Sequence, residues 1–348
     1  MSKPRSLGGP AVALVAAAGL VVTALGVHAA AWIVAPTALA GVLVLVVDPL
    51  RRTLIARGWP GWTGALAVYL TLAALLAAFG LTVAVSMVEL AELAPQYAEE
   101  ASELGQRAAA AFERLGLGST EAAALGARID PVAVVRSLAS ALGSAVSVAG
   151  GLVLLVSLLL FMTVDAARVG PRLAAIGETR PELADALRAF ASGTRRYLLV
   201  ATVFGLAVAV LDGVALWLLG VPLPLLWALL AFVTNYIPNI GFVIGLAPPA
   251  LLALLDGGVG TMLWVVAVYC AVNFVLQSIV QPKIVGDAVD LSVTASFAAV
   301  LVWTWLIGGL GAVLAIPLTL LVKALLVDAP KNRPWTAVLA ANGSLPER

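Results

Sequence analysis

Asn235, Pro238 and Gly241 interrupt an apolar stretch that carries no charged residue between Asp212 and Asp256. Proline lacks a backbone donor and obstructs the helix before it, and glycine loosens the backbone around it. Within a bilayer, such irregular backbone is tolerated only where protein buries it or where it lines a water-filled cavity. This pattern therefore favours non-covalent recognition of a polar solute or an ion, and not catalysis of a covalent reaction.

The predicted pathway at this break consists of Asn235, Tyr236, Pro238, Asn239 and Gly241. The two asparagine amides can donate hydrogen bonds to a solute and accept them from it. They can equally satisfy backbone groups that the break frees inside a buried turn, and one side chain can do both. The sequence leaves these two roles open.

Asp212 is a carboxylate well inside a predicted membrane helix, and its neighbours in sequence offer no counter-charge. A carboxylate at the centre of a membrane helix costs about 2.5–3.5 kcal/mol on insertion scales, and less toward the interface. One interpretation makes Asp212 a proton or cation site that couples transport to an ion gradient. The other keeps it hydrated near the outer surface, and its position toward the outer end of the helix favours this second interpretation.

Other polar and aromatic residues in the apolar stretches have simpler expected roles. Asn273 and Gln277 lie four residues apart on one helix face, which favours hydrogen bonds between helices. Trp303 and Trp305 stand close to a second break and are candidates to line the pathway. His28 is expected to lie in a tight external turn without a functional role.

The content of cysteine and histidine excludes several kinds of site. With one Cys and one His, the chain forms no internal disulfide and no Cys-based zinc site. A His-Glu-x-x-His motif is absent, and a single histidine near the membrane edge disfavours a serine–histidine pair. No Gly-x-x-x-x-Gly-Lys-Ser/Thr loop is present. We therefore expect no cofactor and no enzymatic activity, with energy supplied by an ion gradient or by the gradient of the solute.

The composition defines an integral membrane protein. Of 348 residues, 62% are hydrophobic and 11% are charged, and the mean hydropathy is +1.07. Apolar runs long enough to cross a ~30 Å hydrocarbon core recur, and the net charge of +1 gives no reason to expect a nucleic-acid partner. Membrane helices are predicted at about 10–27, 29–47, 62–88, 146–164, 198–219 and 259–280, with broken apolar segments at about 222–255 and 291–327.

The basic residues predict the orientation in the membrane. Sixteen of the twenty Lys and Arg residues fall on one side of the predicted helices, and the other four lie within 89–136 together with eight acidic residues. Because short cytoplasmic loops carry an excess of Lys and Arg, the larger group marks the cytoplasm. This predicts a multi-pass protein of the bacterial inner membrane with both termini in the cytoplasm.

Six segments follow from this topology. The third membrane helix is expected to continue past Glu89 into an external helical insert, bent near Pro95. The insert either packs on itself or contacts neighbouring subunits in a homo-oligomer of unknown order. An amphipathic helix in the cytoplasmic loop is expected to lie at the lipid headgroups. The segments are the membrane helices of 1–88, the extracytoplasmic insert 89–145, the membrane helix 146–164, the cytoplasmic amphipathic loop 165–197, the transport core 198–330 and the cytoplasmic tail 331–348.

The transport core contains two broken segments. Split at Pro238, the first gives two arms of about 16 residues, too short to cross comfortably, so it is predicted to enter from outside and return. The second turns between Gly308 and Gly311 and is predicted to enter from the cytoplasm, although its longer arms also allow two full crossings. Inverted repeats with broken helices near the midplane are typical of secondary transporters. The predicted fold is an all-α polytopic helical bundle with two re-entrant hairpins in inverted repeat and a small external helical insert.

The same motifs resemble the AI-2E (autoinducer-2 exporter) family of bacterial membrane proteins over nearly the whole chain. The resemblance rests on Asn235 to Gly241, on Gln281 to Gly286 and on Gly311 to Leu318. Asp290 and the two residues after it are similar to the branch that contains the autoinducer-2 exporter itself. Lys283 either attracts an anionic solute or serves only as a topology charge. These motifs and the second turn extend the predicted substrate pathway to Gln281, Pro282, Lys283, Asp290, Gly308 and Gly311.

The chain departs from the family pattern at two places. Many members carry a His-Pro pair where this chain has Ser292 and Val293, and many place a proline where it has Phe242. These departures leave the implied fold unchanged but leave substrate transfer open. Members of the family have been assigned to autoinducer-2 export and to sodium/proton exchange.

The resemblance implies a transporter embedded in the lipid bilayer that moves a small polar solute, such as an autoinducer-2-like molecule, out of the cell or exchanges ions. Two alternatives remain beside this expectation. One is a sodium/proton antiporter. The other is an oligomeric channel or scaffold without active transport, which flux measurements with and without an ion gradient would distinguish.

Overall fold

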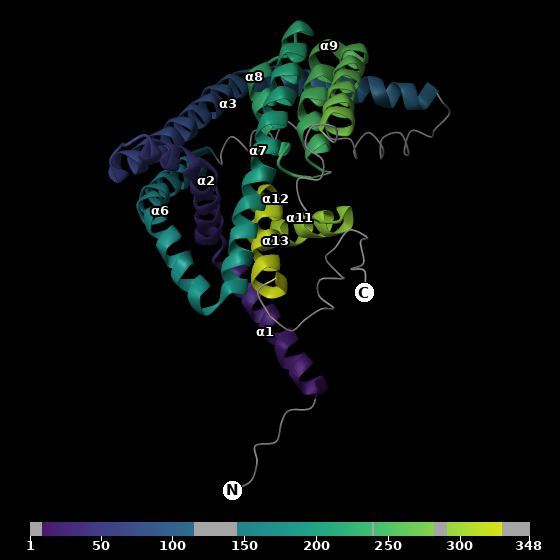
Figure 1. Ribbon diagram of the computed structural model, residues 1–348. Coiled ribbons are helices and arrows are strands. Elements are labelled where there is room, and N and C mark those ends of the chain that lie inside the picture. The colour runs from purple at the N-terminus through teal and green to yellow at the C-terminus, as the bar shows by residue number, and fades with distance from the viewer. Residues whose placement is uncertain (1–8, 115–144, 239, 282–290, 329–348) are drawn as a thin grey trace.

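The computed structural model describes residues 9–114, 145–238, 240–281 and 291–328, and the regular elements in these ranges are all helices. Figure 1 shows them as a bundle in which long helices surround shorter, broken ones. By length and composition, five of the described helical stretches can cross a membrane, which confirms a polytopic all-α membrane protein. These stretches are Ala31–Ala56, Gly61–Leu93, Gly150–Thr179, Pro181–Leu218 and Gly241–Val280.

Large apolar side chains cover the outside of the bundle. Trp32, Leu75, Phe161 and Trp217 each expose between 62% and 70% of their surface. A soluble protein rarely leaves apolar patches of this extent open to water. These faces are therefore suited to contact with lipid chains.

The N-terminal helices α1 (Gly9–Ala29) and α2 (Ala31–Ala56) are separated by a single residue, Ala30. Both apolar runs predicted in this region are thus helical. In Figure 1, α1 projects away from the bundle toward the N-terminus. It therefore contributes little to the packing of the helices that follow it.

The main partner of α1 comes from the other end of the sequence. Ala24 and Val27 of α1 pack against Leu306 and Ile307 of α11 (Val293–Ile307). The hydropathy of the sequence does not predict this contact. It indicates that each helix is apolar, but it does not indicate which other helix packs against it.

Helix α3 runs without interruption from Gly61 to Arg114. Its 54 residues extend about 81 Å, whereas the hydrocarbon core is ~30 Å thick. The helix therefore continues well beyond the membrane, as the charged residues after Glu89 predict, and it contains Pro95. The rest of the predicted insert, residues 115–144, lies outside the described residues.

Helices α6 (Ala145–Thr179) and α7 (Pro181–Leu218) are joined by the single residue Arg180. Apart from Arg180, the predicted cytoplasmic loop 165–197 is therefore helical, and its position at the lipid headgroups stays a prediction. The loop consists of the end of α6 and the start of α7, which pack against each other. The amphipathic spacing in this segment reflects the face of α7 that packs in the bundle.

Asp48 ties α2 to α7 at one end of the bundle. Its carboxylate accepts hydrogen bonds from Arg51 at 2.8 Å and Arg52 at 2.6 Å, and Arg195 of α7 lies 3.5 Å away. Arg195 also donates to the carbonyl of Leu45 at 2.8 Å. The three arginines surround a carboxylate that is only 7% exposed. All three belong to the predicted cytoplasmic group, and this contact brings them to the same side of the bundle.

We expect Asp48→Ala to lower the midpoint of thermal unfolding of the detergent-solubilised protein by several degrees. The substitution leaves three cations clustered without an anion, and breaking a buried ion pair costs about 3–5 kcal/mol. The loss here is smaller because Arg52 is 63% exposed. High salt should recover part of the loss, since it screens the repulsion among the arginines.

The matched control is Asp185→Ala. It removes a pair with Arg188 in which the two side chains are 72% and 54% exposed, and exposed pairs contribute little to stability. Equal midpoints for Asp48→Ala and Asp185→Ala at low salt would contradict the stabilising role of Asp48.

The second half of the chain contains the predicted breaks. Helix α8 (Pro224–Thr234) has 11 residues and a length of about 16 Å, so it cannot cross a membrane alone. Helix α9 (Gly241–Asn273) follows the first break and is itself divided at Gly258, where φ is 76°. The final part of α9 continues into η1 (Phe274–Val280). Gly258 confirms the predicted division between the broken segment and the helix after it.

The second broken segment comprises α11, α12 (Gly309–Val313), α13 (Ala315–Lys323) and η2 (Ala324–Asp328). Gly308, with φ at 75°, ends α11 and starts α12. Helices α12 and α13 pack back along α11. Breaks at both predicted places are thus confirmed, while their entry from opposite sides of the membrane stays a prediction.

Candidate functional site

Short backbone hydrogen bonds hold the first break between α8 and α9. The N–H of Ile237 donates to the Thr234 carbonyl at 2.8 Å, and the N–H of Gly241 donates to the Ile237 carbonyl at 3.1 Å. Pro238 has no N–H, so the helical ladder cannot pass through it. Because the turn satisfies these backbone groups itself, the side chain of Asn235 is available to other helices.

Asn235 links the break to two neighbouring helices. Its Nδ2 donates to the carbonyl of Ala201 in α7 at 2.9 Å, and its Oδ1 accepts from Nε2 of Gln277 in η1 at 3.0 Å. A Cβ at Gly205 would lie 2.9 Å from Nδ2 of Asn235, so α7 lacks a side chain where the amide approaches. The amide of Asn235 therefore bonds across helices, where the sequence also allowed it to cap its own turn.

Polar residues recur at every fourth position along the helix opposite Asn235. Nε2 of Gln277 also donates to Oδ1 of Asn273 at 2.8 Å, and Nδ2 of Asn273 donates to the carbonyl of Tyr269 at 2.9 Å. Gln281 follows one turn later, just after η1. The predicted bonding between helices is confirmed for Gln277, whereas Asn273 bonds within its own helix.

Tyr236 makes further polar contacts with α7, one closer to the start of that helix than Ala201 and the other at the residue after Ala201. Its hydroxyl lies 2.7 Å from Oγ1 of Thr202, and its backbone carbonyl accepts from the hydroxyl of Tyr197 at 2.9 Å. The aromatic ring thereby holds the break against α7 at a second point, next to the bond made by Asn235.

These groups form a polar strip along one face of α7. The strip runs from Tyr197 to Asp212, a distance of about 22 Å along the helix axis, which is most of a ~30 Å hydrocarbon core. The polar strip consists of Tyr197, Thr202, Asp212, Asn235, Tyr236, Tyr269, Asn273 and Gln277.

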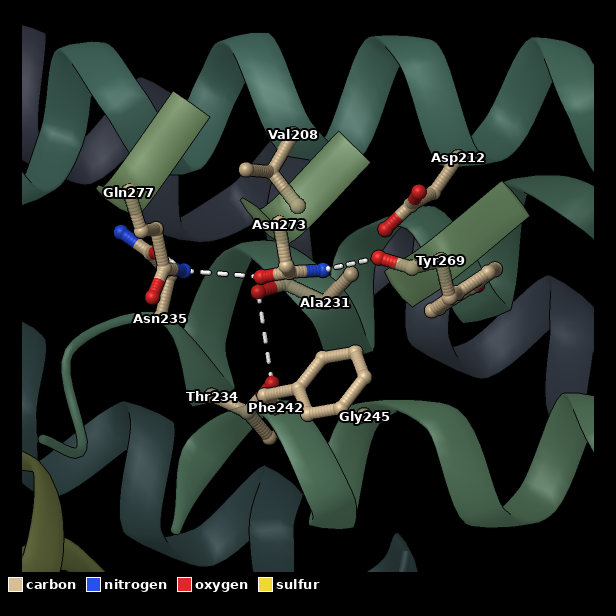
Figure 2. Close-up of a pocket in the computed structure, with 10 residues that line it drawn as sticks. All are labelled: Val208, Asp212, Ala231, Thr234, Asn235, Phe242, Gly245, Tyr269, Asn273 and Gln277. Atoms are coloured by element: carbon tan, nitrogen blue, oxygen red, sulfur yellow. Dashed lines mark hydrogen bonds between the residues drawn. The ribbon is translucent and has the colours of Figure 1, made fainter. Parts of the chain in front are cut away.

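Part of the strip borders a small cavity, which Figure 2 shows. Its volume is about 10 Å³, room for about one water molecule. Asp212 and Asn235 both line it, together with Phe242 and Tyr269. The cavity thus brings together two groups that the sequence singled out separately, a carboxylate and an amide.

Asp212 is fully buried, with 0% of its surface exposed. The predicted hydrated position near the outer surface is therefore wrong. The reason is the packing around that end of α7, where Leu90 and Tyr97 of α3 and Trp227 of α8 form one buried cluster with Leu216. Figure 2 shows the carboxyl group pointing from α7 toward the segment that carries Tyr269.

The two breaks share a local arrangement. A Cβ added to Gly241 would overlap the backbone carbonyl of Thr234, and a Cβ added to Gly311 would overlap that of Trp303. In each case a glycine just after the break lies directly against a carbonyl of the helix before it. The close approach of the two arms therefore requires glycine at both positions.

The two breaks also contact each other. Ile237 and Ile240 of the first break pack in one cluster with Ala312 and Ala315 of the second. Gly308 and Gly311 thus lie next to the first break, although they take no part in the cavity. The predicted pathway residues Asn239, Pro282, Lys283 and Asp290 lie outside the described residues.

His28 supports the second break from α1. Its Nδ1 lies 2.9 Å from the carbonyl of Trp305, and the two rings stack at 5.4 Å. Gly308 ends α11 three residues after Trp305, so the carbonyl that His28 contacts lies in the last turn of this helix. Carbonyls in the last turn lack N–H donors within the helix. Trp303 donates from Nε1 to Thr319 at 3.0 Å across the same break. His28 therefore makes a structural contact, and its expected lack of a functional role stays a prediction.

Sequence reasoning missed Tyr197, Thr202 and Tyr269 as members of the strip. For Tyr269 a signal exists, because it precedes Asn273 and Gln277 at a spacing of four and so extends one polar helix face. The other two residues carry no such signal, since aromatic and hydroxyl side chains are common in membrane helices.

The chain is similar to known proteins over this whole region. Residues 17–331 match the family described as AI-2E family transporter. YhhT of Escherichia coli (strain K12) is 30% identical over 327 residues, which cover 94% of this chain and 93% of YhhT. The AI-2 transport protein TqsA of the same strain is 28% identical over 328 residues, which cover 92% and 93% of the two chains. The family match includes both breaks and the whole polar strip.

Proposed function

The chain belongs to the family of AI-2E transporters, and from this premise we propose that it exports a small polar solute across the bacterial inner membrane. The observation that carries the proposal is the polar strip, which offers amide and hydroxyl groups inside an apolar bundle. Neutral donors and acceptors suit an uncharged solute with several hydroxyl groups, such as an autoinducer-2-like molecule. The similarity to a protein named for AI-2 transport supports the same class of solute.

The strip must open for a solute to pass. A cavity of about 10 Å³ holds about one water, so a molecule of several heavy atoms needs the surrounding helices to separate. We propose that the two broken segments are re-entrant hairpins of opposite orientation, which expose the strip alternately to the two sides. Their mutual contact at Ile237 and Ala312 supports this, because movement of one hairpin then affects the other.

The orientation proposed for this cycle places both termini and the arginines around Asp48 in the cytoplasm. The extension of α3 beyond the membrane then lies outside, where it offers a surface for neighbouring subunits of a homo-oligomer. Transport by this route requires no bond chemistry, and we propose no enzymatic step.

Solute flux in proteoliposomes tests the proposal. The purified full-length protein is reconstituted, the vesicles are loaded with autoinducer-2, and efflux is followed with and without an imposed proton or sodium gradient. We expect saturable efflux that vesicles without protein do not show. No efflux above that control, for autoinducer-2 and for a panel of small sugars and polyols, would contradict a solute transporter and leave ion exchange or a scaffold.

Cysteine accessibility tests the position of the first break. In a Cys270→Ala background, Asn235→Cys and Asn239→Cys are expected to react with a membrane-impermeant thiol reagent added outside, because the opened hairpin hydrates them. Gln96→Cys on the exposed side of α3 is the positive control, and Leu159→Cys at a fully buried position is the negative one. If both asparagine positions stay unlabelled in every transport state while Gln96→Cys reacts, entry of this hairpin from outside is excluded.

A further inference from the structure

Asp212 and Tyr269 carry the polar side-chain atoms of the strip that no described group satisfies. Both carboxylate oxygens of Asp212 and the hydroxyl of Tyr269 are buried without a hydrogen-bond partner. The two residues are 0% and 1% exposed. Each such atom costs about 1–3 kcal/mol, and more when it is charged. The other side chains of the strip are all hydrogen-bonded, so this pair requires an explanation of its own.

No charged group among the described residues compensates Asp212. Helix α8 carries no ionisable side chain. In α9, Asp256 acts on Tyr97 and Cys270 is exposed, which leaves Tyr269 as the ionisable group beside the carboxylate. On the other elements packed against α7, Asp48 pairs with Arg51, Arg52 and Arg195, Asp165 pairs with Arg168, and Lys323 pairs with Asp328. Arg172 and Glu178 are exposed near the end of α6 that leads into α7, whereas Asp212 lies toward the other end of α7.

We propose that Asp212, with Tyr269 beside it, is a proton-binding site that couples solute transport to the proton gradient. An ionised carboxylate loses its hydration in this cavity and gains no cation in return, so the closed form holds Asp212 as a neutral acid. When a hairpin opens and water enters, the carboxylate becomes hydrated and its O–H bond breaks, releasing the proton to that water. On closure toward the other side, one carboxylate oxygen takes a proton from water there.

The cavity fits a proton better than Na⁺. A proton needs one oxygen, whereas a sodium ion needs a shell of several oxygen ligands. The cavity has room for about one water, and Asp212 is the one acid among the residues that line it. The amide oxygens of Asn235 and Asn273 also line it, but they already accept hydrogen bonds from Gln277. In the part of the chain that is described, no cluster of three or more His, Cys, Asp or Glu side chains is present.

The proton site and the proposed solute contacts lie on the same face of α7. Ala201, which accepts from Asn235, precedes Asp212 by about 16 Å along the helix axis. The arms of the first hairpin cover both points, since Asn235 leads into that break and Phe242 lines the cavity. One hairpin movement therefore changes the hydration of the acid and the contacts of the solute together. This coupling rests on the proposed function, but the binding of a proton does not.

Infrared difference spectroscopy tests the binding step without any solute. The full-length protein in lipid is titrated with acid and base, and the carbonyl band of protonated carboxyl groups is recorded. We expect a band that persists to neutral pH in the wild type, disappears in Asp212→Asn and remains in Asp256→Asn, which removes an exposed carboxylate of α9. Tyr269→Phe should keep the band, because the hydroxyl of Tyr269 makes no hydrogen bond to the carboxylate in the closed form.

Three results would overturn the proton site. These are the absence of the band from the wild type at neutral pH, its persistence in Asp212→Asn, and its removal by adding sodium in place of N-methylglucamine at constant pH. The last outcome would assign the site to Na⁺. In the flux assay, Asp212→Asn is expected to lose the acceleration by a pH gradient and to retain solute exchange without a gradient. If the wild-type protein shows no solute flux but gives the expected infrared result, the solute pathway is refuted and the proton site stays in place.

Discussion

Gly241→Val and Gly311→Val are each expected to lower solute flux by roughly 5–150-fold, since overpacking costs about 1–3 kcal/mol. In both positions a Cβ would overlap a backbone carbonyl of the preceding arm, and a carbonyl cannot rotate away as a flexible side chain can. The two arms must therefore separate, and the broken segment loses its closed form. Flux in proteoliposomes is the measurement, with the amount of inserted protein determined in parallel.

Two other glycines, in the helix after the first broken segment and in the second broken segment, provide controls. Gly260 in α9 and Gly309 in α12 have open space where a Cβ would lie, so Gly260→Val and Gly309→Val should transport at near the wild-type rate. Normal flux from Gly241→Val and Gly311→Val would show that the close approach of the arms is not needed. Equal loss from all four variants would point to a general intolerance of β-branched residues in these helices.

Asn235→Leu is expected to lower flux by roughly 5–150-fold, because it removes the hydrogen bonds of Asn235 with the Ala201 carbonyl and with Nε2 of Gln277, and each such bond contributes about 0.5–1.5 kcal/mol. Leucine has the same number and branching of side-chain heavy atoms as asparagine, so the substitution removes hydrogen bonds without leaving a cavity. The same variant should unfold at a lower temperature in detergent. Asn235→Asp keeps an acceptor for Gln277 but no donor for Ala201, and we expect an intermediate flux.

Ser157→Ala is the control for a general loss of polarity. Ser157 in α6 bonds to a carbonyl of its own helix, so its removal should leave flux unchanged. The double variant Asn235→Leu with Gln277→Leu should be no slower than the slower single variant if the two residues act as one unit. Additive losses would show that each amide contacts the solute independently.

The features predicted correctly from the sequence are those with a local signal. Pro238 and Gly308 break helices by their own chemistry, so both interruptions could be placed within a few residues. The extension of α3 follows from the helical spacing that continues past Glu89. The polar contacts of Asn235 follow from one amide in an apolar run beside a proline, while its contact with a solute stays a prediction.

The features missed depend on which helices become neighbours. Asp212 is near the end of its helix, where sequence alone predicts hydration, but the extension of α3 and the short α8 bury it. The arginines that meet at Asp48 come from helices far apart in sequence. The amphipathic pattern of 165–197 falls on the end of α6 and the start of α7, which pack against each other, and its position at the lipid headgroups stays a prediction. Periodicity identifies a buried face without identifying its partner.

The contact between His28 and Trp305 has a consequence for biosynthesis. The two residues are 277 positions apart, and at about 5–20 residues per second the ribosome needs roughly 14–55 s to cover that distance. For this time α1 is already synthesised but lacks its main partner, because α11 has not yet been made. The second break can only be completed once α11 has emerged and reached the first helix. Closure of this contact is therefore among the late events of assembly in the membrane, after the framework of α2, α3, α6 and α7 has been synthesised.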